Sequence, residues 1–324
     1  HRLLEGELPT NLATLRTGSQ LNIWARIKKD RNAIAELPNE LTALRIADAI
    51  RRFPSAGFGP RQLTLSPDER ELLVTNYYSG TVSILSAISG RLLRTVSLGK
   101  QPPPAPARRG ELIFHDATRA FQRWQSCSSC HPNQGRVDGL RWDFLRDGIG
   151  NGKDTPSLVL VDQTEPLNRR ATRPTLRVGA RTGFTSGHFM VPAESEVNDL
   201  LAYLVSRRPE ANPHRDTDGD LPAAANRGKK LFFGQAACAA CHPPPNFTDN
   251  KMHNVGVISD TDPDGRYDTP TLIEGYRTAP YLHDGRALTL KAVFTDHDPT
   301  GIHGKTKTLS NQELDDLVAY LRSL

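Results

Sequence analysis

Short apolar segments alternate with turn signals between residues 54 and 100. Four segments alternate apolar with polar positions or are rich in β-branched residues, namely 61–65, 71–76, 81–85 and 91–96. Ser-Pro-Asp, Tyr-Ser-Gly and Ser-Gly sequences separate them, and these residue types favour turns. The pattern predicts four short strands joined by turns, as in one blade of a β-propeller. A small irregular β-domain is the alternative.

The end of the chain has a helical period instead. Ser310 and Glu313 match a capping box, which marks the start of a helix. Apolar residues then recur at spacings of three and four, at Leu314, Leu317, Val318, Leu321 and Leu324. The spacing predicts a closing helix that packs one face against a core.

The chain repeats itself after residue 107. Four segments recur in the same order: 109–114 as 227–232, 127–131 as 238–242, 155–158 as 269–272, and 199–206 as 316–323. Four ordered matches indicate two copies of one domain. Each copy should run from a helix through long loops to a closing helix.

Proline-rich stretches divide the chain into parts. Residues 101–106 contain four prolines, which makes a stiff, extended linker. The predicted organisation is a β segment with this linker over 1–105, a first domain over 106–215 and a second over 216–324. Because one propeller blade cannot bury its own faces, we expect further repeats upstream or on a partner chain. The lack of an initiator Met and of a signal peptide indicates a mature form or a fragment.

Composition narrows the class of protein. Hydrophobic residues make up 37% of the 324 residues and charged residues 24%, which is typical of a globular protein. No apolar run approaches the ~18 residues of a membrane span. The net charge of +5 is mild and the Lys and Arg residues are scattered, so no nucleic-acid-binding surface is expected.

All four cysteines lie in two C-x-x-C-H sequences, Cys127–His131 and Cys238–His242. This is the attachment signal for c-type haem: two thiols bond to the porphyrin, and the histidine binds the iron. The alternative to haem attachment is that these cysteines bind zinc or form disulfides. A zinc ribbon, however, would need its two C-x-x-C pairs roughly 15–20 residues apart. We expect two covalent haem c groups on Cys127, Cys130, His131, Cys238, Cys241 and His242. Such haem is attached outside the cytoplasmic membrane, so the protein should be periplasmic or at the cell surface.

Tandem domains of this order resemble the bacterial di-haem cytochrome c peroxidases and MauG-like enzymes over residues 107–324. The most specific shared sequence is Thr-Ala-Pro-Tyr-Leu-His-Asp-Gly at 278–285. Residues 138–158 are similar to the branch that is often fused to YVTN propellers, and residues 66–99 look like a YVTN-type repeat. The resemblance implies a mainly α fold with two cytochrome c-like haem domains, preceded here by the β segment.

In that family the first haem is peroxidatic, and the second is low-spin and passes electrons to it. The implied function is reduction of H₂O₂ to water with electrons from a small cytochrome c or cupredoxin. A MauG-like oxidase that modifies Trp or Tyr of a partner protein is an alternative. A non-enzymatic di-haem electron-transfer cytochrome is another.

The resemblance also implies axial ligands. The second ligand of haem 2 lies fourteen residues after His283, which is His297; His303 is the alternative. In typical peroxidases a histidine sixteen residues after the proximal one caps haem 1, but Asp147 stands there. A carboxylate is not a usual haem ligand, so we expect an open iron, with His188 as an alternative ligand.

The family's acid–base glutamate aligns with Glu194, with Glu196 as second choice. Such a group would carry the proton that peroxide cleavage requires. The other interpretation of Glu194 is a carboxylate in the first turn of a helix, where it suits the helix dipole.

The family binds Ca²⁺ between the two haems, and the matching residues are Asp154, Thr278 and Pro280. Aspartate replaces the family's asparagine, but a carboxylate is an equally hard oxygen ligand. The family also places a Trp between the haems, whereas residues 167–170 read Leu-Asn-Arg-Arg.

Overall fold

The computed structural model describes residues 50, 52–143 and 150–324, and Asp147 lies outside them. The chain divides into two compact units, residues 1–101 and 102–324.

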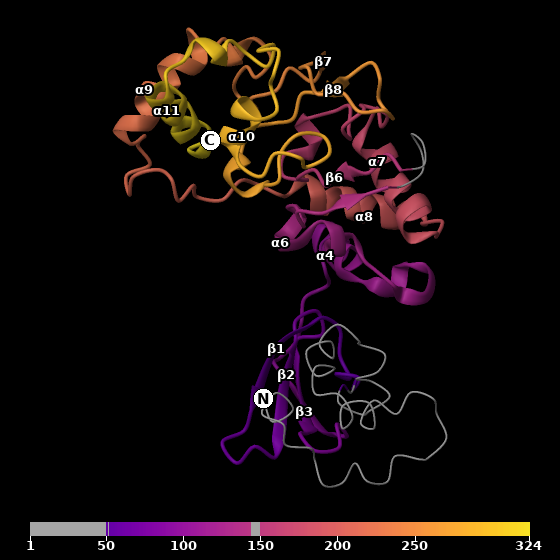
Figure 1. Cartoon of the computed structure of the whole chain (residues 1–324). Helices are drawn as coiled ribbons and strands as arrows, with labels where there is room; N and C mark the ends of the chain where they lie inside the picture. Colours follow the sequence, from indigo (N-terminus) through magenta and orange to yellow (C-terminus); the bar gives the residue numbers. More distant parts are fainter. Residues whose placement is uncertain (1–49, 51, 144–149) are drawn as a thin grey trace, which may run out of the picture. The chain divides into compact units, whose positions relative to one another are not determined.

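The described part of the first unit is a four-stranded antiparallel sheet (Figure 1). Its strands pair in chain order: β1 (Pro60–Leu65), β2 (Glu71–Asn76), β3 (Thr81–Ser86) and β4 (Leu92–Ser97). The two central strands carry the buried residues Val74, Ile84 and Leu85, while β1 and β4 are exposed along their length. The four predicted strands are therefore confirmed; a propeller blade remains a prediction.

The second unit is mainly helical. Its α-helices are α4 (Pro106–His115), α5 (Cys127–Cys130), α6 (Pro132–Gly135), α7 (Leu176–Thr182), α8 (Glu194–Val205), α9 (Ala223–Phe233), α10 (Leu290–Thr295) and α11 (Asn311–Arg322). Short 3-10 turns are η3 (Ala117–Arg119), η4 (Phe121–Arg123), η5 (Val161–Gln163), η7 (Cys238–Ala240), η8 (Gly275–Arg277) and η9 (Thr306–Thr308), and η6 (Gly183–His188) is a π-helical turn. Two small hairpins pair β5 (Arg141–Trp142) with β6 (Lys153–Asp154), and β7 (Met252–Asn254) with β8 (Arg266–Asp268).

The same helix pair occurs twice in this unit, as α4 on α8 and as α9 on α11. At each crossing a glycine meets the partner helix so closely that a Cβ would overlap a carbonyl oxygen: Gly110 at Asp199, and Gly228 at Asp316. Only glycine permits this approach. The arginine before each glycine pairs with the same aspartate, at 2.6 Å for Arg109 and 2.7 Å for Arg227. The repeated sequence therefore produces the same helix packing twice.

Each helix pair has its own hydrophobic core. The first contains Ile113, Phe114, Val161, Leu176, Ala180, Phe184, Leu200, Tyr203 and Leu204. The second contains Phe232, Val293, Phe294 and Tyr320, together with Leu314, Leu317 and Leu321 of α11 and Leu324 just after it. Val318, the remaining residue of the predicted stripe, is half-buried. The predicted capping box is also present, because Ser310 N donates to Glu313 Oε2 at 2.8 Å. Both predictions for the closing helix are confirmed.

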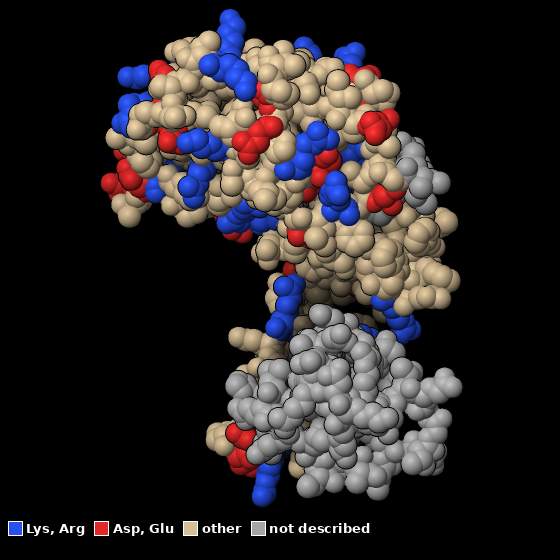
Figure 2. All heavy atoms as spheres, in the orientation of Figure 1, with Lys and Arg blue, Asp and Glu red and all other residues tan. Residues whose placement is uncertain are grey.

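Charged side chains of both signs are interspersed over the visible face of this unit (Figure 2). Many form ion pairs, such as Lys291 with Asp315 at 2.6 Å. Within the described residues, no helix has the length and apolar character needed to cross a membrane.

Candidate active site

The first C-x-x-C-H borders a cavity of about 290 Å³. Cys127, Cys130 and His131 line one side of it, and apolar side chains from α4, α7 and α8 line much of the rest: Phe114, Leu176, Ala180, Leu200 and Leu204. The wall is therefore of the kind that holds a flat apolar group.

Local structure directs the three attachment residues into this cavity. Ser126 and Ser129 form a capping box that starts the single turn of α5, and His131 N donates to Cys127 O at 2.9 Å. Neither cysteine is in a disulfide. Burial raises the pKa of Cys127 to about 12 and lowers the pKa of His131 to about 4. His131 is therefore neutral at pH 7, which is the form that binds a metal.

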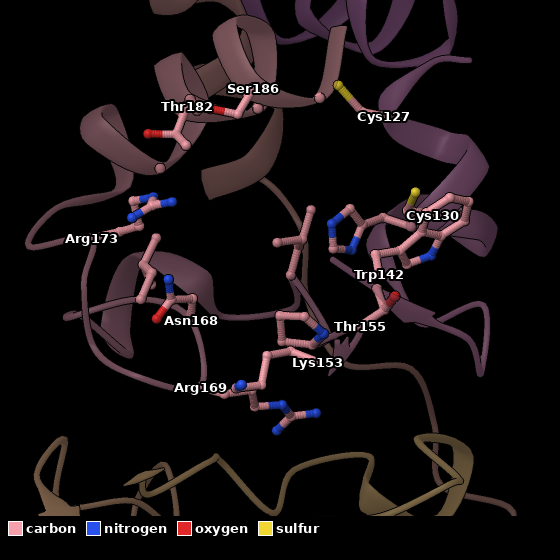
Figure 3. A pocket seen from close by; sticks show the side chains of 18 of the residues that line it. Cys127, Cys130, Trp142, Lys153, Thr155, Asn168, Arg169, Arg173, Thr182 and Ser186 are labelled. Carbon is pink, nitrogen blue, oxygen red and sulfur yellow. The ribbon is translucent and has the colours of Figure 1, made fainter. Parts of the chain in front are cut away.

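Polar side chains surround the rest of the first cavity (Figure 3). Thr182 and Ser186 come from α7 and η6, and Asn168 and Arg173 lie across the cavity from the cysteines. Of the described residues that line it, His131 is the one imidazole, and none is Met or Tyr. The part of the cavity away from the two cysteines thus offers hydroxyl, amide and guanidinium groups.

The second C-x-x-C-H borders a separate cavity of about 210 Å³. Cys238, Cys241 and His242 line it, and His242 N donates to Cys238 O at 2.9 Å. The Nδ1 of His242 lies 2.9 Å from Phe247 O. Since a carbonyl oxygen can only accept, Nδ1 is the donor, and Nε2 keeps the free lone pair with which a histidine can bind a metal.

His303 also lines the second cavity. Burial and the nearby His242 lower its pKa to about 4, and its Nδ1 is buried without a hydrogen-bond partner in the described structure. Gly304 holds this loop against the C-x-x-C-H: its φ is +75°, and a Cβ there would lie 2.9 Å from Ala236 O. His303 and His242 are therefore brought together at one cavity.

His297 does not line the second cavity. It follows α10, where its backbone N–H donates to Ala292 O at 3.2 Å. Of the two histidines expected as candidate ligands, His303 therefore lines the cavity of His242 and His297 does not. The loop after α10 brings His303, six positions after His297, to the cavity that His242 lines.

Glu194 lies outside the first cavity. It begins α8, its side chain is 57% exposed, and it pairs with Arg177 at 3.3 Å and with Arg181. The structure therefore supports its interpretation as a carboxylate in the first turn of a helix. Glu196 does not line the first cavity either: it accepts from Ala193 N at 2.9 Å and pairs with Arg119.

His188 ends η6 and is buried. Its Nε2 lies 3.9 Å from Cys127 Sγ, but the side chain does not line the first cavity. Burial lowers the pKa of His188. It is placed beside Cys127.

The expected calcium residues lie near the wall between the two cavities. Asp154 is buried; its Oδ2 accepts from Arg169 at 2.7 Å, and its Oδ1 has no partner among the described groups. That Oδ1 lies 3.7 Å from where a Cβ of Gly285 would stand, beside the loop that carries Thr278 and Pro280. Burial raises the pKa of Asp154 to about 6, against the effect of Arg169. An unsatisfied buried carboxylate oxygen fits a hard cation.

Two residues near these cavities were not singled out by the sequence. Tyr267 stacks on His283 with ring centroids 3.8 Å apart, and both line the second cavity. Arg169 lines both cavities. Its only sequence signal was its place in the Leu-Asn-Arg-Arg segment, where the family has a Trp.

Residues 225–324 match the family model for cytochrome c. The methylamine utilization protein MauG of Methylorubrum extorquens is 34% identical over 302 residues, which cover 74% of this chain and 85% of that protein. The chain belongs to the MauG and di-haem cytochrome c peroxidase family. Membership supports a di-haem oxidoreductase with covalently bound haem c.

Other relatives agree on the fold. Hydrazine synthase subunit gamma of Kuenenia stuttgartiensis is 29% identical over 274 residues, covering 67% of this chain and 77% of that one. A solved structure of that organism's hydrazine synthase matches with a TM-score of 0.67 and 24% identity, covering 72% of this chain and 99% of that chain. The diheme peroxidase BthA from Burkholderia thailandensis matches with a TM-score of 0.51 and 17% identity, covering 69% of this chain and 86% of that one.

Proposed function

We propose that this chain is a di-haem peroxidase that reduces H₂O₂ to water. Its electrons would come from a small cytochrome c or cupredoxin, and it would work in the periplasm or at the cell surface. The observation that carries the proposal is the difference between the two cavities. The first cavity has His131 but no second imidazole, thioether or phenol among its described lining residues, whereas the second has His303 as well as His242.

This difference suits different roles for the two haems. An iron with one protein ligand keeps a position for peroxide, and an iron between two imidazoles is suited to electron transfer. Burial keeps His131, His242 and His303 neutral at pH 7, so none has to lose a proton to bind a metal. We therefore assign haem 1 to the first cavity as the reactive centre and haem 2 to the second as the electron entry point.

The polar groups across the first cavity from the cysteines would have a role in this reaction. Arg173 and Asn168 can donate hydrogen bonds to a bound peroxide, and the Thr182 hydroxyl can both donate and accept (Figure 3). Charge-assisted hydrogen bonds from a guanidinium are the strongest of these. The apolar side chains behind them limit water in the cavity.

We also propose that the chain binds Ca²⁺. Asp154 would supply a carboxylate oxygen, and Thr278 and Pro280 their main-chain carbonyls. The buried Oδ1 of Asp154 supports this, and Ca²⁺ would supply a fixed positive charge near both cavities.

A MauG-like oxidase remains the second candidate, and the 34% identity to MauG favours it. It would use peroxide to oxidise Trp or Tyr of a partner protein. Steady-state turnover of H₂O₂ with a reduced small redox protein separates the two functions, because only a peroxidase sustains it without a protein product. Two low-spin ferric haems would instead indicate the third function, electron transfer alone.

Electron paramagnetic resonance of the ferric holoprotein tests the ligand assignment. We expect one high-spin and one low-spin haem. His303→Gly should convert the low-spin signal to high-spin, while the matched variant His297→Gly should leave it unchanged. The reverse result would return the ligand role to His297 and contradict the assignment.

A further inference from the structure

Arg169 lines both cavities, and no other described residue does. It lies between Asn168 and Arg170, in the segment that passes beneath the first cavity (Figure 3). Its side chain is 16% exposed, so its charge is largely removed from solvent. A guanidinium stays protonated at any working pH.

Two anchors hold Arg169 in this wall. Its Nη2 donates to Asp154 Oδ2 at 2.7 Å and its Nε to Asp154 O at 3.4 Å. Its own carbonyl accepts from Asp268 N at 3.0 Å. Asp154 lines the first cavity and Asp268 the second, so the residue is fixed to the wall of each.

We propose that the Arg169 guanidinium is a charge shared by the two haem centres, which raises the reduction potentials of both. The inference rests on the proposed function, in that both cavities must hold haem. A fixed positive charge favours the reduced state, because reduction lowers the charge on the iron. The effect is larger in a buried wall, where solvent screens it less. Asp154 offsets part of this charge, so the shift should be moderate.

A shared charge serves a peroxidase with two centres. A charge beside one haem alone would change the potential difference between the haems and so the driving force for transfer. A charge common to both changes the two potentials in the same direction and largely preserves that difference. Arg169 thus sets the range of reduction potential in which both haems accept electrons.

The chain offers a matched control in Arg170. Its side chain is 20% exposed and it pairs with Asp264 at 2.7 Å, but it lines the first cavity only. Arg170→Gln should therefore shift haem 1 more than haem 2, while Arg169→Gln should shift both.

The experiment is a spectroelectrochemical titration of the full-length ferric holoprotein with calcium present. For Arg169→Gln we expect the reduced-to-oxidised ratio of each haem to fall about tenfold at a fixed applied potential, which is ~59 mV for a one-electron couple. Arg169→Lys should bring the reduced-to-oxidised ratio of each haem most of the way back to its wild-type value. Haem and calcium contents are measured first, and they should match the wild type.

Each outcome decides one claim. Fewer than two haems in the wild-type protein would refute the proposed function itself. If Arg169→Gln keeps both haems and its calcium yet shifts one potential or neither, the shared charge is refuted. Equal shifts of both reduction potentials in Arg170→Gln would also refute the shared charge, since a residue that lines only the first cavity would then act equally on both haems.

Discussion

The buried ion pair between Arg136 and Glu274 can be tested by changing one carboxyl to an amide. Arg136 Nε and Nη2 donate to the two carboxylate oxygens, each at 2.9 Å. The side chains are only 6% and 2% exposed. Arg136 follows the first C-x-x-C-H, and Glu274 precedes η8 in the second half, so the pair joins segments 138 residues apart. Glu274→Gln removes the negative charge and keeps the shape.

The expected loss in free energy of unfolding follows from the burial of the Arg136–Glu274 pair. Removing one partner of a buried pair costs about 3–5 kcal/mol, because the other charge is left uncompensated. Arg136 retains Glu210 at 3.2 Å and the Asn133 carbonyl at 2.7 Å. We therefore expect the lower value, about 3 kcal/mol. For a unit of this size the melting temperature should fall by roughly 6–12 °C.

Thermal unfolding of the holoprotein, followed by circular dichroism, measures this loss. The control is Asp315→Asn, which removes the carboxylate of the exposed Lys291 pair in the same unit. Exposed pairs contribute ~1 kcal/mol or less. The double variant Arg136→Met with Glu274→Leu should recover much of the loss, since apolar side chains can replace a buried pair. If Glu274→Gln melts no lower than Asp315→Asn, the assignment of stability to burial is refuted.

Three further predictions follow from the site. Acid–acetone extraction should leave two haems on the polypeptide, and mass spectrometry showing fewer would contradict covalent attachment at both C-x-x-C-H sequences. Glu194→Gln should keep peroxide turnover within about twofold, because the side chain lies outside the cavity; a loss of the ~10²–10⁴-fold expected of an acid–base group would restore its catalytic role. Burial raises the pKa of Asp268 to about 7, although Arg169 lowers it. The native state therefore holds a proton that the unfolded chain has released, so this contribution to stability is lost as pH rises from about 4 to about 7. Melting curves of Asp268→Asn across this range should depend less on pH than those of the wild type, and parallel curves would exclude the effect.

The sequence alone determined the features that depend on short spacings. Two thiols and an imidazole in C-x-x-C-H come together through one helical turn, so their chemistry is local. The strands at 60–97 and the capped helix α11 likewise follow from alternation, turn residues and a capping box. The repeat was visible because the same close helix crossing requires the same glycine and arginine in each copy.

Tertiary structure decided what depends on the path of long loops. Both His297 and His303 satisfy the chemistry of an axial ligand, and the tertiary structure shows that His303 lines the cavity of His242 while His297 does not. Glu194 had a suitable position in sequence, but two arginines of α7 hold it at the surface. Arg169 gave little signal, because its significance comes from lying in a wall common to two cavities. Contacts between distant segments depend on how whole elements pack, and residue spacing does not encode them directly.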